Sequence, residues 1–411
     1  MSIPSQSFDV VVVGGGIAGV SAAIQASRSG CRTALVEKTV FWGGLATAGL
    51  VNIFLPLCDG YGTQVSYGIC EELIRHCNDL GPGNITATWK SERGASNDSQ
   101  RFRSTFSPAA YILSLDQMLV EAGVVPWLDT VVTGARVSNG RITALTVENE
   151  SGRVLLKGRR FVDASGSAVL ARRLGMKLHT AKNYKSIWVY ETNGGKVLMH
   201  YGPVGASANV EKYYGDDVLA AAGYTRESLA ADTVEGISGR IVSDYIMGTR
   251  RCVREFYRDC FEKKGEDRES HFPVTLPSMP QLRMIAAIDA PTMMRDGGEW
   301  TTAQDSVGMV ADWRKSGSVW EVPYSSLHAA DGPENLLFAG RCMGAIGDAW
   351  DVMRVIPCAA VTGQAAGLAA AVSLKHRVQT TGMPYGLLEK ELRNLDLPLH
   401  FEDLNLKRPS H

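Results

Sequence analysis

The chain has 411 residues, long enough for two or three units of ordinary domain size, and its 42 Lys and Arg against 43 Asp and Glu give a formal charge of −1. No long block of one charge sign marks a nucleic-acid arm, so we expect no nucleic-acid partner. The eight cysteines form no C-x-x-C pair and no cluster with His at zinc-ligand spacing, so neither an iron–sulfur site nor any other metal site is expected.

Cysteine usage and the N-terminal segment favour a soluble, cytoplasmic protein. Scattered thiols suit a reducing compartment. The apolar start from Phe8 to Ile24 lacks a basic leader, carries Asp9 at its front edge and is broken by glycines, so it does not resemble a signal peptide. No segment approaches an uninterrupted apolar span of about 18 residues, and we expect no membrane contact.

Residues 8–37 predict a strand, a helix and a second strand in that order. Phe8 to Val13 is a continuous apolar run, as expected for a strand buried on both faces of a parallel sheet. From Ile17 the apolar residues recur at helical spacing, and Gly30 stands where a helix ends. Arg32 to Glu37 then resumes the strand pattern.

Three glycines between that strand and helix have the spacing G-x-G-x-x-G. Gly14 would allow the tight turn, Gly16 the close approach of a pyrophosphate, and Gly19 the close packing of helix on strand. The pyrophosphate would lie at the positive end of the helix, and Glu37 would bind the adenosine ribose. A glycine-rich turn beside a surface glutamate is the alternative, but the ordered pattern predicts a dinucleotide site.

A β-meander is predicted between this unit and a second strand end. Val131 and Val132, residues 142–147 and residues 154–156 read as strands joined by turns at Asn139-Gly140 and Ser151-Gly152. A further buried strand, 161–163, then runs into a glycine turn. A simple nicotinamide dehydrogenase is not built with such an insertion.

Residues 181–320 differ in character and predict an inserted cap. Strands 187–191 and 196–201 flank Asn193-Gly194, a strong hairpin signal, and 238–264 predicts one long helix. Ile241, Tyr245 and Cys260 are among the residues expected on its apolar face.

The C-terminal region predicts a strand at 336–339, a turn at Gly340-Arg341 and a helix from Pro357 rich in Ala and Gly. Small residues let such a helix press closely against a flat neighbour. Its positive N-terminus would suit a reduced flavin, which carries negative charge.

Together these stretches resemble the FAD-dependent oxidoreductase family with the glutathione-reductase-like fold, and in particular a bacterial subgroup of it. The resemblance covers about half of the chain, roughly residues 8–70, 120–180 and 320–375. The motifs that carry it are Gly43-Gly44-Leu45-Ala46-Thr47, Asp163-Ala164-Ser165-Gly166, Val322-Pro323-Tyr324, Ala339-Gly340-Arg341, Arg354-Val355-Ile356-Pro357 and Gly363-Gln364-Ala365-Ala366-Gly367.

The resemblance implies that the glycine turn and Glu37 hold the ADP half of FAD. Val132 would offer its backbone to adenine, Asp163 and Gly166 would close the adenosine side, and the chain from Gly340 onward would reach the ribityl chain and ring. The implied FAD contacts are Gly14, Gly16, Ile17, Ala18, Gly19, Glu37, Lys38, Gly43, Gly44, Leu45, Ala46, Val132, Ala164, Gly166, Gly340, Arg341, Asp348, Arg354, Pro357, Gly363 and Gln364.

The expected fold class is therefore α/β: a Rossmann-like FAD-binding domain, made of a parallel sheet plus a β-meander, with an inserted α+β cap domain. Residues 1–75, 120–180 and 321–411 would form the FAD-binding domain. Residues 76–119 and 181–320 would form the substrate or cap domain.

Three residues are candidates for catalysis. His200, at the end of a cap strand, is either a base or an ordinary half-buried histidine. Arg283 corresponds to a family arginine and could orient a carboxylate or an oxyanion. Tyr324 either faces the cleft or packs in the core. Cys342 and Cys358 are too far apart for a redox dithiol.

The sequence thus predicts an FAD-dependent oxidoreductase that transfers a hydride between a small organic substrate and flavin. The alternatives are an FAD- or NAD-binding protein without redox turnover and a nicotinamide-only dehydrogenase. The expected partner is a small molecule, and the sequence leaves a homo-oligomer open.

Overall fold

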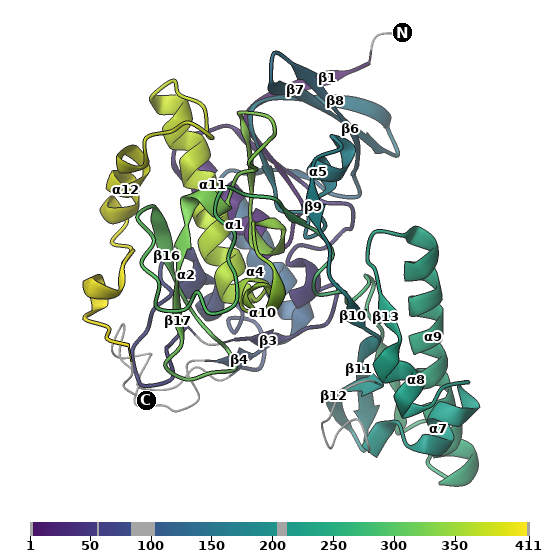
Figure 1. The fold of residues 1–411 in the computed structure, drawn as a ribbon. Helices are drawn as coiled ribbons and strands as arrows, with labels where there is room; N and C mark the ends of the chain where they lie inside the picture. Colours follow the sequence, from purple (N-terminus) through teal and green to yellow (C-terminus); the bar gives the residue numbers. More distant parts are fainter. Residues whose placement is uncertain (1–2, 56, 84–102, 204–211, 409–411) are drawn as a thin grey trace. The chain divides into compact units, whose positions relative to one another are not determined.

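A computed structural model describes residues 3–55, 57–83, 103–203 and 212–408 (Figure 1). The chain forms two compact units, the larger made of residues 1–47, 52–179 and 286–411 and the smaller of 48–51 and 180–285. Residues 286–320 and the described parts of 76–119, which we assigned to the cap from sequence, pack within the larger unit. Which unit binds substrate stays a prediction.

The larger unit is built on a seven-stranded sheet. Its strand order is β5-β2-β1-β8-β7-β6, with β18 pairing β8 beside β7. The pairs β1–β2, β1–β8, β2–β5 and β8–β18 are parallel, whereas β6–β7 and β7–β8 are antiparallel. The bounds are β1 Ser5–Val13, β2 Thr33–Val36, β5 Val125–Trp127, β6 Val131–Ser138, β7 Arg141–Asn149, β8 Gly152–Asp163 and β18 Leu336–Phe338.

The sheet confirms the α/β class with a parallel core and a β-meander, because β6, β7 and β8 follow one another as antiparallel neighbours. The apolar residues of β1 explain its central position, since Val10 to Val12 are fully buried between β2 and β8. One detail of the prediction is wrong. Residues 154–156 and 161–163 belong to a single strand, β8, whose first half pairs β7 and whose last residues pair β18.

The other elements of the larger unit are shorter. Two-stranded sheets pair β3 with β4, β9 with β15 and β16 with β17. The strands are β3 Ile53–Phe54, β4 Ser104–Thr105, β9 Leu178–His179, β15 Ala287–Ile288, β16 Ser306–Ala311 and β17 Val319–Pro323, and the α-helices are α1 Ile17–Arg28, α2 Ile69–His76, α4 Pro108–Glu121, α5 Val169–Arg173, α10 Gly347–Met353, α11 Ile356–Lys375 and α12 Tyr385–Asn394.

Helices α1 and α11 pack directly against each other, at backbone distance. A Cβ atom added to Gly363 would lie 2.2 Å from the carbonyl oxygen of Ala18, and one added to Gly367 would lie 2.2 Å from that of Ala22. Both helices advance by four residues between these contacts, so they run parallel. Their N-termini therefore point toward the same end of the unit.

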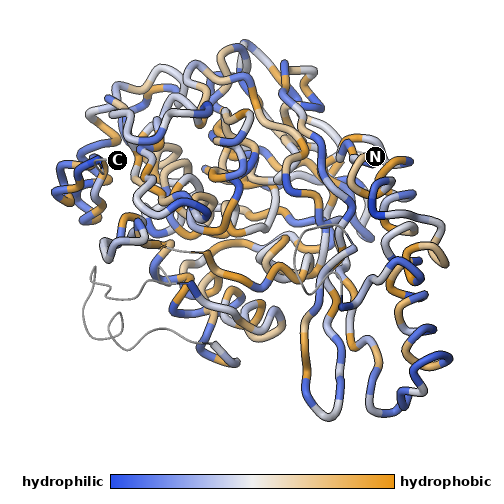
Figure 2. Tube along the Cα trace, turned by 60° about the horizontal axis from the view of Figure 1, so that its bottom comes forward, coloured by the Kyte–Doolittle hydropathy of each residue, from blue (hydrophilic) through white to orange (hydrophobic). Residues whose placement is uncertain are grey.

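Helix α11 is also long and apolar enough to cross a membrane by length and composition, contrary to our expectation that no segment approaches such a span. However, 89% of its apolar window is buried inside the structure. In Figure 2, hydrophobic stretches gather in the middle of the larger unit, where such a helix belongs. Its apolar character is explained by the core that it fills.

The smaller unit consists of a three-stranded antiparallel sheet, a short strand pair and helices. The sheet order is β12-β11-β14, and β10 pairs β13. The bounds are β10 Asn183–Tyr184, β11 Ser186–Asn193, β12 Lys196–Pro203, β13 Thr233–Val234, β14 His271–Thr275, α7 Asp216–Ala221, α8 Arg226–Ala231, α9 Gly239–Arg258 and the π-helix Asp259–Lys263.

The predicted hairpin and long helix are both present in this unit, with two corrections. The hairpin turn is Gly194-Gly195, both at positive φ, because Asn193 already pairs with Lys196. Helix α9 begins after its N-cap Ser238, and Ile241, which we expected on the apolar face, is exposed. Cys252, Phe256 and Cys260 of that face lie in one buried cluster with residues of β11, α7 and α8, as expected for a cap core.

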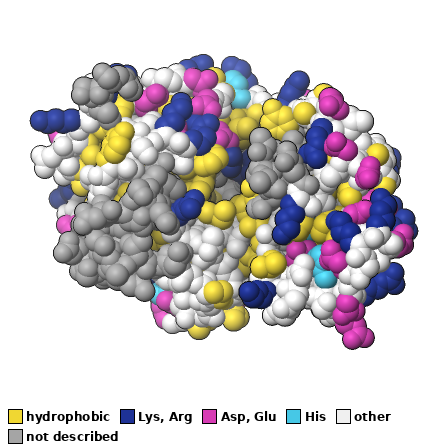
Figure 3. Space-filling view, turned by 90° about the horizontal axis from the view of Figure 1, so that it is seen from below, with side chains coloured by type: hydrophobic (Ala, Val, Ile, Leu, Met, Phe, Trp, Pro, Cys, Tyr) yellow, Lys and Arg dark blue, Asp and Glu magenta, His cyan; other side chains and the backbone are white. Residues whose placement is uncertain are grey.

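The surface carries charges of both signs. On the face drawn in Figure 3, Lys and Arg side chains alternate with Asp and Glu side chains and form no large patch of one sign. This mixed pattern agrees with the small net charge of the sequence.

The close packing of α1 and α11 generates a stability prediction. Gly367→Ala should lower the melting temperature by roughly 1–4 °C, because the new Cβ meets rigid backbone and such overpacking typically costs about 1–3 kcal/mol. The matched control is Gly386→Ala in α12, where nothing lies within 4 Å of an added Cβ. Thermal unfolding followed by circular dichroism measures both, and equal melting temperatures would contradict the packing described.

Candidate functional site

In the turn between β1 and α1, glycine is needed at each of the three motif positions for a different physical reason. Gly14 has a φ of 96°, which favours glycine, and an added Cβ would lie 2.7 Å from the carbonyl oxygen of Ala164. At Gly19 an added Cβ would lie 1.7 Å from the carbonyl oxygen of Gly14. At Gly16, by contrast, nothing lies within 4 Å, and φ is −68°. Gly16 therefore leaves open space at the N-terminus of α1, where Ile17 and Ala18 begin the helix and no side chain caps it.

Glu37 follows β2 and is held beside this turn. Its Oε2 accepts a hydrogen bond from the Gly15 N–H at 2.7 Å, and its Oε1 accepts hydrogen bonds from the N–H and hydroxyl of Thr39 at 2.8 and 2.9 Å. The carboxylate is buried and fixed in orientation by these bonds. A carboxylate thus stands next to the open end of α1, where a ribose-binding acid is needed.

Residues 43–46 lie against the same turn. The N–H of Gly43 donates to the carbonyl of Gly15 at 2.8 Å, and a Cβ on Gly44 would be 3.1 Å from the Cα of Gly16. Both glycines have positive φ, which starts the short 3-10 helix Gly44–Ala46. The segment closes one side of the open space at Gly16.

The end of β8 and the turn at Gly340 meet on the other side. Gly166 has a φ of 70°, and a Cβ there would lie 2.4 Å from the Nε atom of Arg341. Removal from water lowers the pKa of the Arg341 guanidinium to about 10, so a nearby anion would stabilise its charged form. Gly340 donates its N–H to the Thr362 hydroxyl in α11 at 2.9 Å.

Stretches far apart in the sequence therefore converge on the N-termini of α1 and α11. A Cβ on Gly340 would lie 2.9 Å from the Cβ of Ala18 and 3.7 Å from that of Ala359. Gly363 of α11 lies level with Ala18 of α1, so residue 362 is level with Ile17, the first residue of α1. Helix α11 begins six residues earlier, at Ile356, which is an offset of about 9 Å along the helix axes. The two helix ends, which no side chain caps, are thus both positive and are offset from each other along the helix direction.

The sequence matches the family described as FAD dependent oxidoreductase over residues 9–262 and 298–392, which is most of the chain. The chain belongs to this family. It is an FAD-dependent oxidoreductase, and FAD is its cofactor. The site fits that cofactor, because a Cβ would fill the open space at Gly16 and both helix ends favour negative charge. Family membership supports an FAD-dependent redox enzyme over the nicotinamide-only and binding-only alternatives.

Similarity to solved structures is low. A geranylgeranyl bacteriochlorophyll reductase-like protein from Thermoplasma acidophilum is 15% identical, with 97% of this chain and 84% of that chain covered and a TM-score of 0.45. Sdh1 from Mycobacterium smegmatis is 16% identical, with 95% and 73% covered and a TM-score of 0.47. The p-nitrophenol 4-monooxygenase from Pseudomonas putida is 9% identical, with 94% and 83% covered and a TM-score of 0.45. The comparison with curated proteins finds no match.

In this oxidoreductase, the side chains of some predicted FAD contacts form hydrogen bonds with other residues of the protein. Gln364 accepts a hydrogen bond from the Ile69 N–H at 3.0 Å and donates one to the Gln25 Oε1 at 2.9 Å. Its amide thus joins α11 to α2 and α1. Asp163 is fully buried and accepts hydrogen bonds from the N–H groups of Ser165 and Leu170 at 3.1 and 2.7 Å, which holds the turn after β8.

Asp348 and Arg354 belong to an ion-pair network around α10. Both oxygens of Asp348 accept hydrogen bonds from the Arg314 guanidinium, at 2.5 and 2.9 Å. This guanidinium holds the pKa of Asp348 below its usual value. Arg354 pairs with Asp351 at 2.5 Å. Their charges are compensated inside this network.

Tyr324 is a packing residue, contrary to the interpretation that it faces a cleft. Its side chain is buried, its hydroxyl donates to the carbonyl of Thr380 at 2.7 Å, and its ring meets His328 edge to face. Burial raises the pKa of this hydroxyl far above its usual value. Among the described residues, protein thus encloses the Tyr324 side chain.

His200 and Arg283 lie in the smaller unit. His200 is fully buried in β12, where its Nε2 lies 3.1 Å from the Tyr214 hydroxyl and its Nδ1 3.2 Å from Glu191 Oε2. Arg283 is half-buried, with its guanidinium 5.7 Å from the ring centre of Trp188. Tyr324, by contrast, belongs to the larger unit.

The remaining predicted contacts differ in burial and in position. Val132 lies on the edge strand β6, and Thr130 nearby donates its N–H to the Glu37 carbonyl at 3.0 Å. Lys38 is exposed, Leu45 is half-buried, and Ala46, Ala164 and Pro357 are buried.

Sequence reasoning missed two residues of this site. Gly15 is needed because Trp42 packs on it, with an added Cβ only 2.5 Å from the indole ring. Thr39 holds the Glu37 carboxylate. A threonine two residues after a strand-end acid is a local signal for such a bond, whereas the contact between Gly15 and Trp42 has none.

The contrast between Gly16 and Gly19 gives a direct test of the site. Gly16→Ala should leave the melting temperature of the flavin-free protein unchanged, because the new Cβ meets no protein atom and φ suits any residue. It should reduce FAD binding at least tenfold by occupying the space that a pyrophosphate needs. Flavin fluorescence titration measures the affinity.

Gly19→Ala is the matched comparison, because its Cβ would collide with the Gly14 carbonyl and should destabilise the flavin-free fold itself. Unchanged FAD affinity in a correctly folded Gly16→Ala protein would contradict the location of the site.

Proposed function

We propose that this enzyme transfers a hydride between a small organic substrate and FAD, which lies extended from the glycine turn to the N-terminus of α11. The observation that carries the proposal is the parallel alignment of α1 and α11. It gives two positive helix ends, about 9 Å apart along one direction, to a cofactor that is charged at its pyrophosphate and becomes charged at its reduced ring.

The ADP half would occupy the end of α1. The backbone N–H groups at Gly16, Ile17 and Ala18 would donate to the pyrophosphate, with Gly43 and Gly44 close by. Glu37 would accept hydrogen bonds from the ribose hydroxyls with the lone pairs that its backbone donors leave. The edge of β6 at Val132 would face adenine.

The flavin half would continue past Gly340 and Arg341 to the start of α11. FAD, when bound, supplies the hydride acceptor or donor of the reaction. The chain contributes the positive end of α11, which stabilises negative charge on the neighbouring ring, and the small residues that let the helix approach closely. This arrangement supports the finer interpretation of a glutathione-reductase-like FAD domain.

Arg283 is the catalytic candidate that we retain for substrate. Its guanidinium lies 5.7 Å from the ring centre of Trp188 in the smaller unit, and a guanidinium can bind a carboxylate or an oxyanion through two parallel hydrogen bonds. His200 and Tyr324 are enclosed by protein, which argues against a direct role for either. We therefore favour a small, carboxylate-bearing substrate, and a cytoplasmic enzyme that uses neither nucleic acid nor a membrane.

Absorbance and anaerobic bleaching test the proposed reaction. Purified protein should absorb at about 375 and 450 nm, as oxidised flavin does, and a substrate added without oxygen should bleach the band at about 450 nm. A panel of small carboxylates and their uncharged amides tests the class. Bleaching by the amides but not by the acids would overturn the substrate class.

Substitutions separate the roles of Arg283 and Tyr324. Arg283→Ala should raise KM for a carboxylate substrate by about 10- to 100-fold, a loss of about 1.5–3 kcal/mol of charge-assisted hydrogen bonding. Arg283→Lys should recover part of this loss. Tyr324→Phe removes a buried hydroxyl that donates to the Thr380 carbonyl, so turnover should stay within a factor of two or so. Initial-rate kinetics measure kcat and KM for each variant. A larger loss of kcat/KM for Tyr324→Phe than for Arg283→Ala would contradict the assignment of Arg283, rather than Tyr324, to substrate binding.

A further inference from the structure

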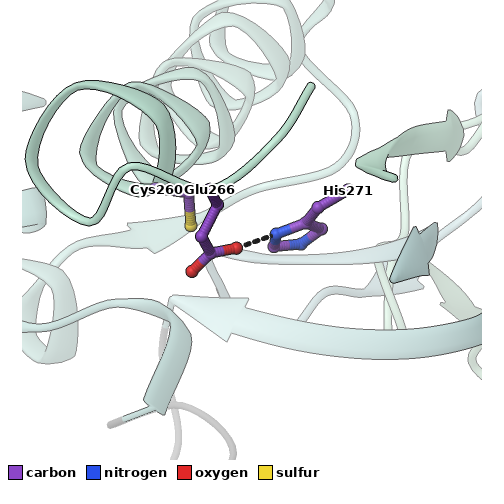
Figure 4. A group of neighbouring side chains, drawn as sticks. All are labelled: Cys260, Glu266 and His271. Carbon is purple, nitrogen blue, oxygen red and sulfur yellow. Dashed lines mark hydrogen bonds and ion pairs between the residues drawn. The ribbon is translucent and has the colours of Figure 1, made fainter. Parts of the chain in front are cut away.

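A second group of reactive side chains lies inside the smaller unit, and the FAD chemistry does not use it. Cys260, Glu266 and His271 each present a ligand atom, and these atoms all lie within 4.8 Å of one another. Figure 4 shows the thiol and the carboxylate from one side and the imidazole from the other, converging on the same point.

The fold brings these residues together where α9 ends. The π-helix Asp259–Lys263 follows α9 and buries Cys260. The N–H of Glu266 donates to the Cys260 carbonyl at 3.0 Å, and that of His271 donates to the Asp267 carbonyl at 2.9 Å, which starts β14. A backbone hydrogen bond therefore joins the positions of Cys260 and Glu266, and π-helical turns are frequent at functional sites.

The second nitrogen of His271 is already oriented. Its Nδ1 contacts Glu266, while its Nε2 lies 3.1 Å from Oε2 of the fully buried Glu191. A carboxylate on one imidazole nitrogen fixes the tautomer that offers the lone pair of the other nitrogen to a metal. Glu191 is held in turn by the Tyr257 hydroxyl at 2.8 Å.

A metal bound here would meet a negatively charged ligand set, because a bound thiolate and a carboxylate each carry one negative charge. The fully buried Glu191 lies beside this group, with its Oε2 3.1 Å from His271 Nε2 and 3.2 Å from His200 Nδ1. A divalent cation would balance a Cys260 thiolate and the Glu266 carboxylate, and would leave Glu191 to pair with His200.

We propose that Cys260, Glu266 and His271 bind one Zn²⁺ ion, with a solvent molecule as the fourth ligand. A thiolate, an imidazole and a carboxylate form the mixed sulfur, nitrogen and oxygen donor set that suits zinc. The Glu266 side chain, 35% exposed, provides the access route from solvent. The ion ties the end of α9 to β14, and this role is independent of the proposed function at the FAD site.

Metal binding to the intact flavoprotein tests the proposal. After dialysis against a chelator, the holoenzyme should take up about one Zn²⁺ per chain, measured by mass spectrometry of the metal after gel filtration. Co²⁺ in place of Zn²⁺ should add a thiolate-to-cobalt charge-transfer band in the near ultraviolet. The difference between the Co²⁺ and Zn²⁺ forms cancels the flavin absorbance.

Matched variants locate the site. Cys260→Ser should abolish the charge-transfer band, whereas Cys252→Ser, a buried cysteine of α9 that is not in the group, should keep it. Glu191→Gln should weaken Zn²⁺ binding by about 10- to 100-fold as a positioning effect, with the band retained. Glu266→Gln at a partly exposed position should weaken binding without loss of the FAD spectrum, which covers the case that Cys260→Ser does not fold.

Two results would overturn the proposal. The first is a folded, FAD-containing wild-type protein that takes up no stoichiometric Zn²⁺ or Co²⁺. The second is a charge-transfer band and Zn²⁺ affinity that Cys260→Ser and Glu266→Gln leave unchanged.

Discussion

The direct backbone contact between α1 and α11 is the constraint on which the rest of the larger unit depends. At Gly363 and Gly367 the two helices approach so closely that no side chain fits between them. The contact fixes their parallel direction and their relative height, and thereby sets both positive helix ends toward the same side. The approach is possible because α11 is rich in Ala and Gly. The burial of α11 explains why its composition resembles that of a membrane-spanning helix.

The proposed FAD site consists mainly of space that the backbone leaves open. Gly16 leaves space, whereas Gly14 and Gly19 allow the strand, turn and helix to come close enough to frame that space. Polar side chains nearby, such as Gln364 and Asp163, are used to hold the framing elements together. Motif membership alone therefore does not separate residues that contact a ligand from residues that position the backbone.

The smaller unit differs from the larger one because it buries ionisable side chains in its core, which costs free energy unless their charges are compensated. Glu191 carries its negative charge there because His200, His271 and Tyr257 surround it. Such a network is costly unless every charge is compensated, which is why a cation at Cys260, Glu266 and His271 is consistent with the unit as a whole. It also removes His200 from the list of groups free to serve a substrate.

Local patterns in the sequence were sufficient for the α/β class, the strand–glycine–helix unit, the meander, the hairpin and the FAD-binding family, because strand and helix periodicity and turn chemistry act over a few residues. Only the tertiary structure decided that Gln364 bridges three helices, that Tyr324 is enclosed, that β8 is one strand, and that Cys260, Glu266 and His271 meet. These partners lie far from one another in sequence or at spacings that match no motif. Long-range packing chooses among many chemically equivalent pairings, and no short stretch of chain carries the information that selects one.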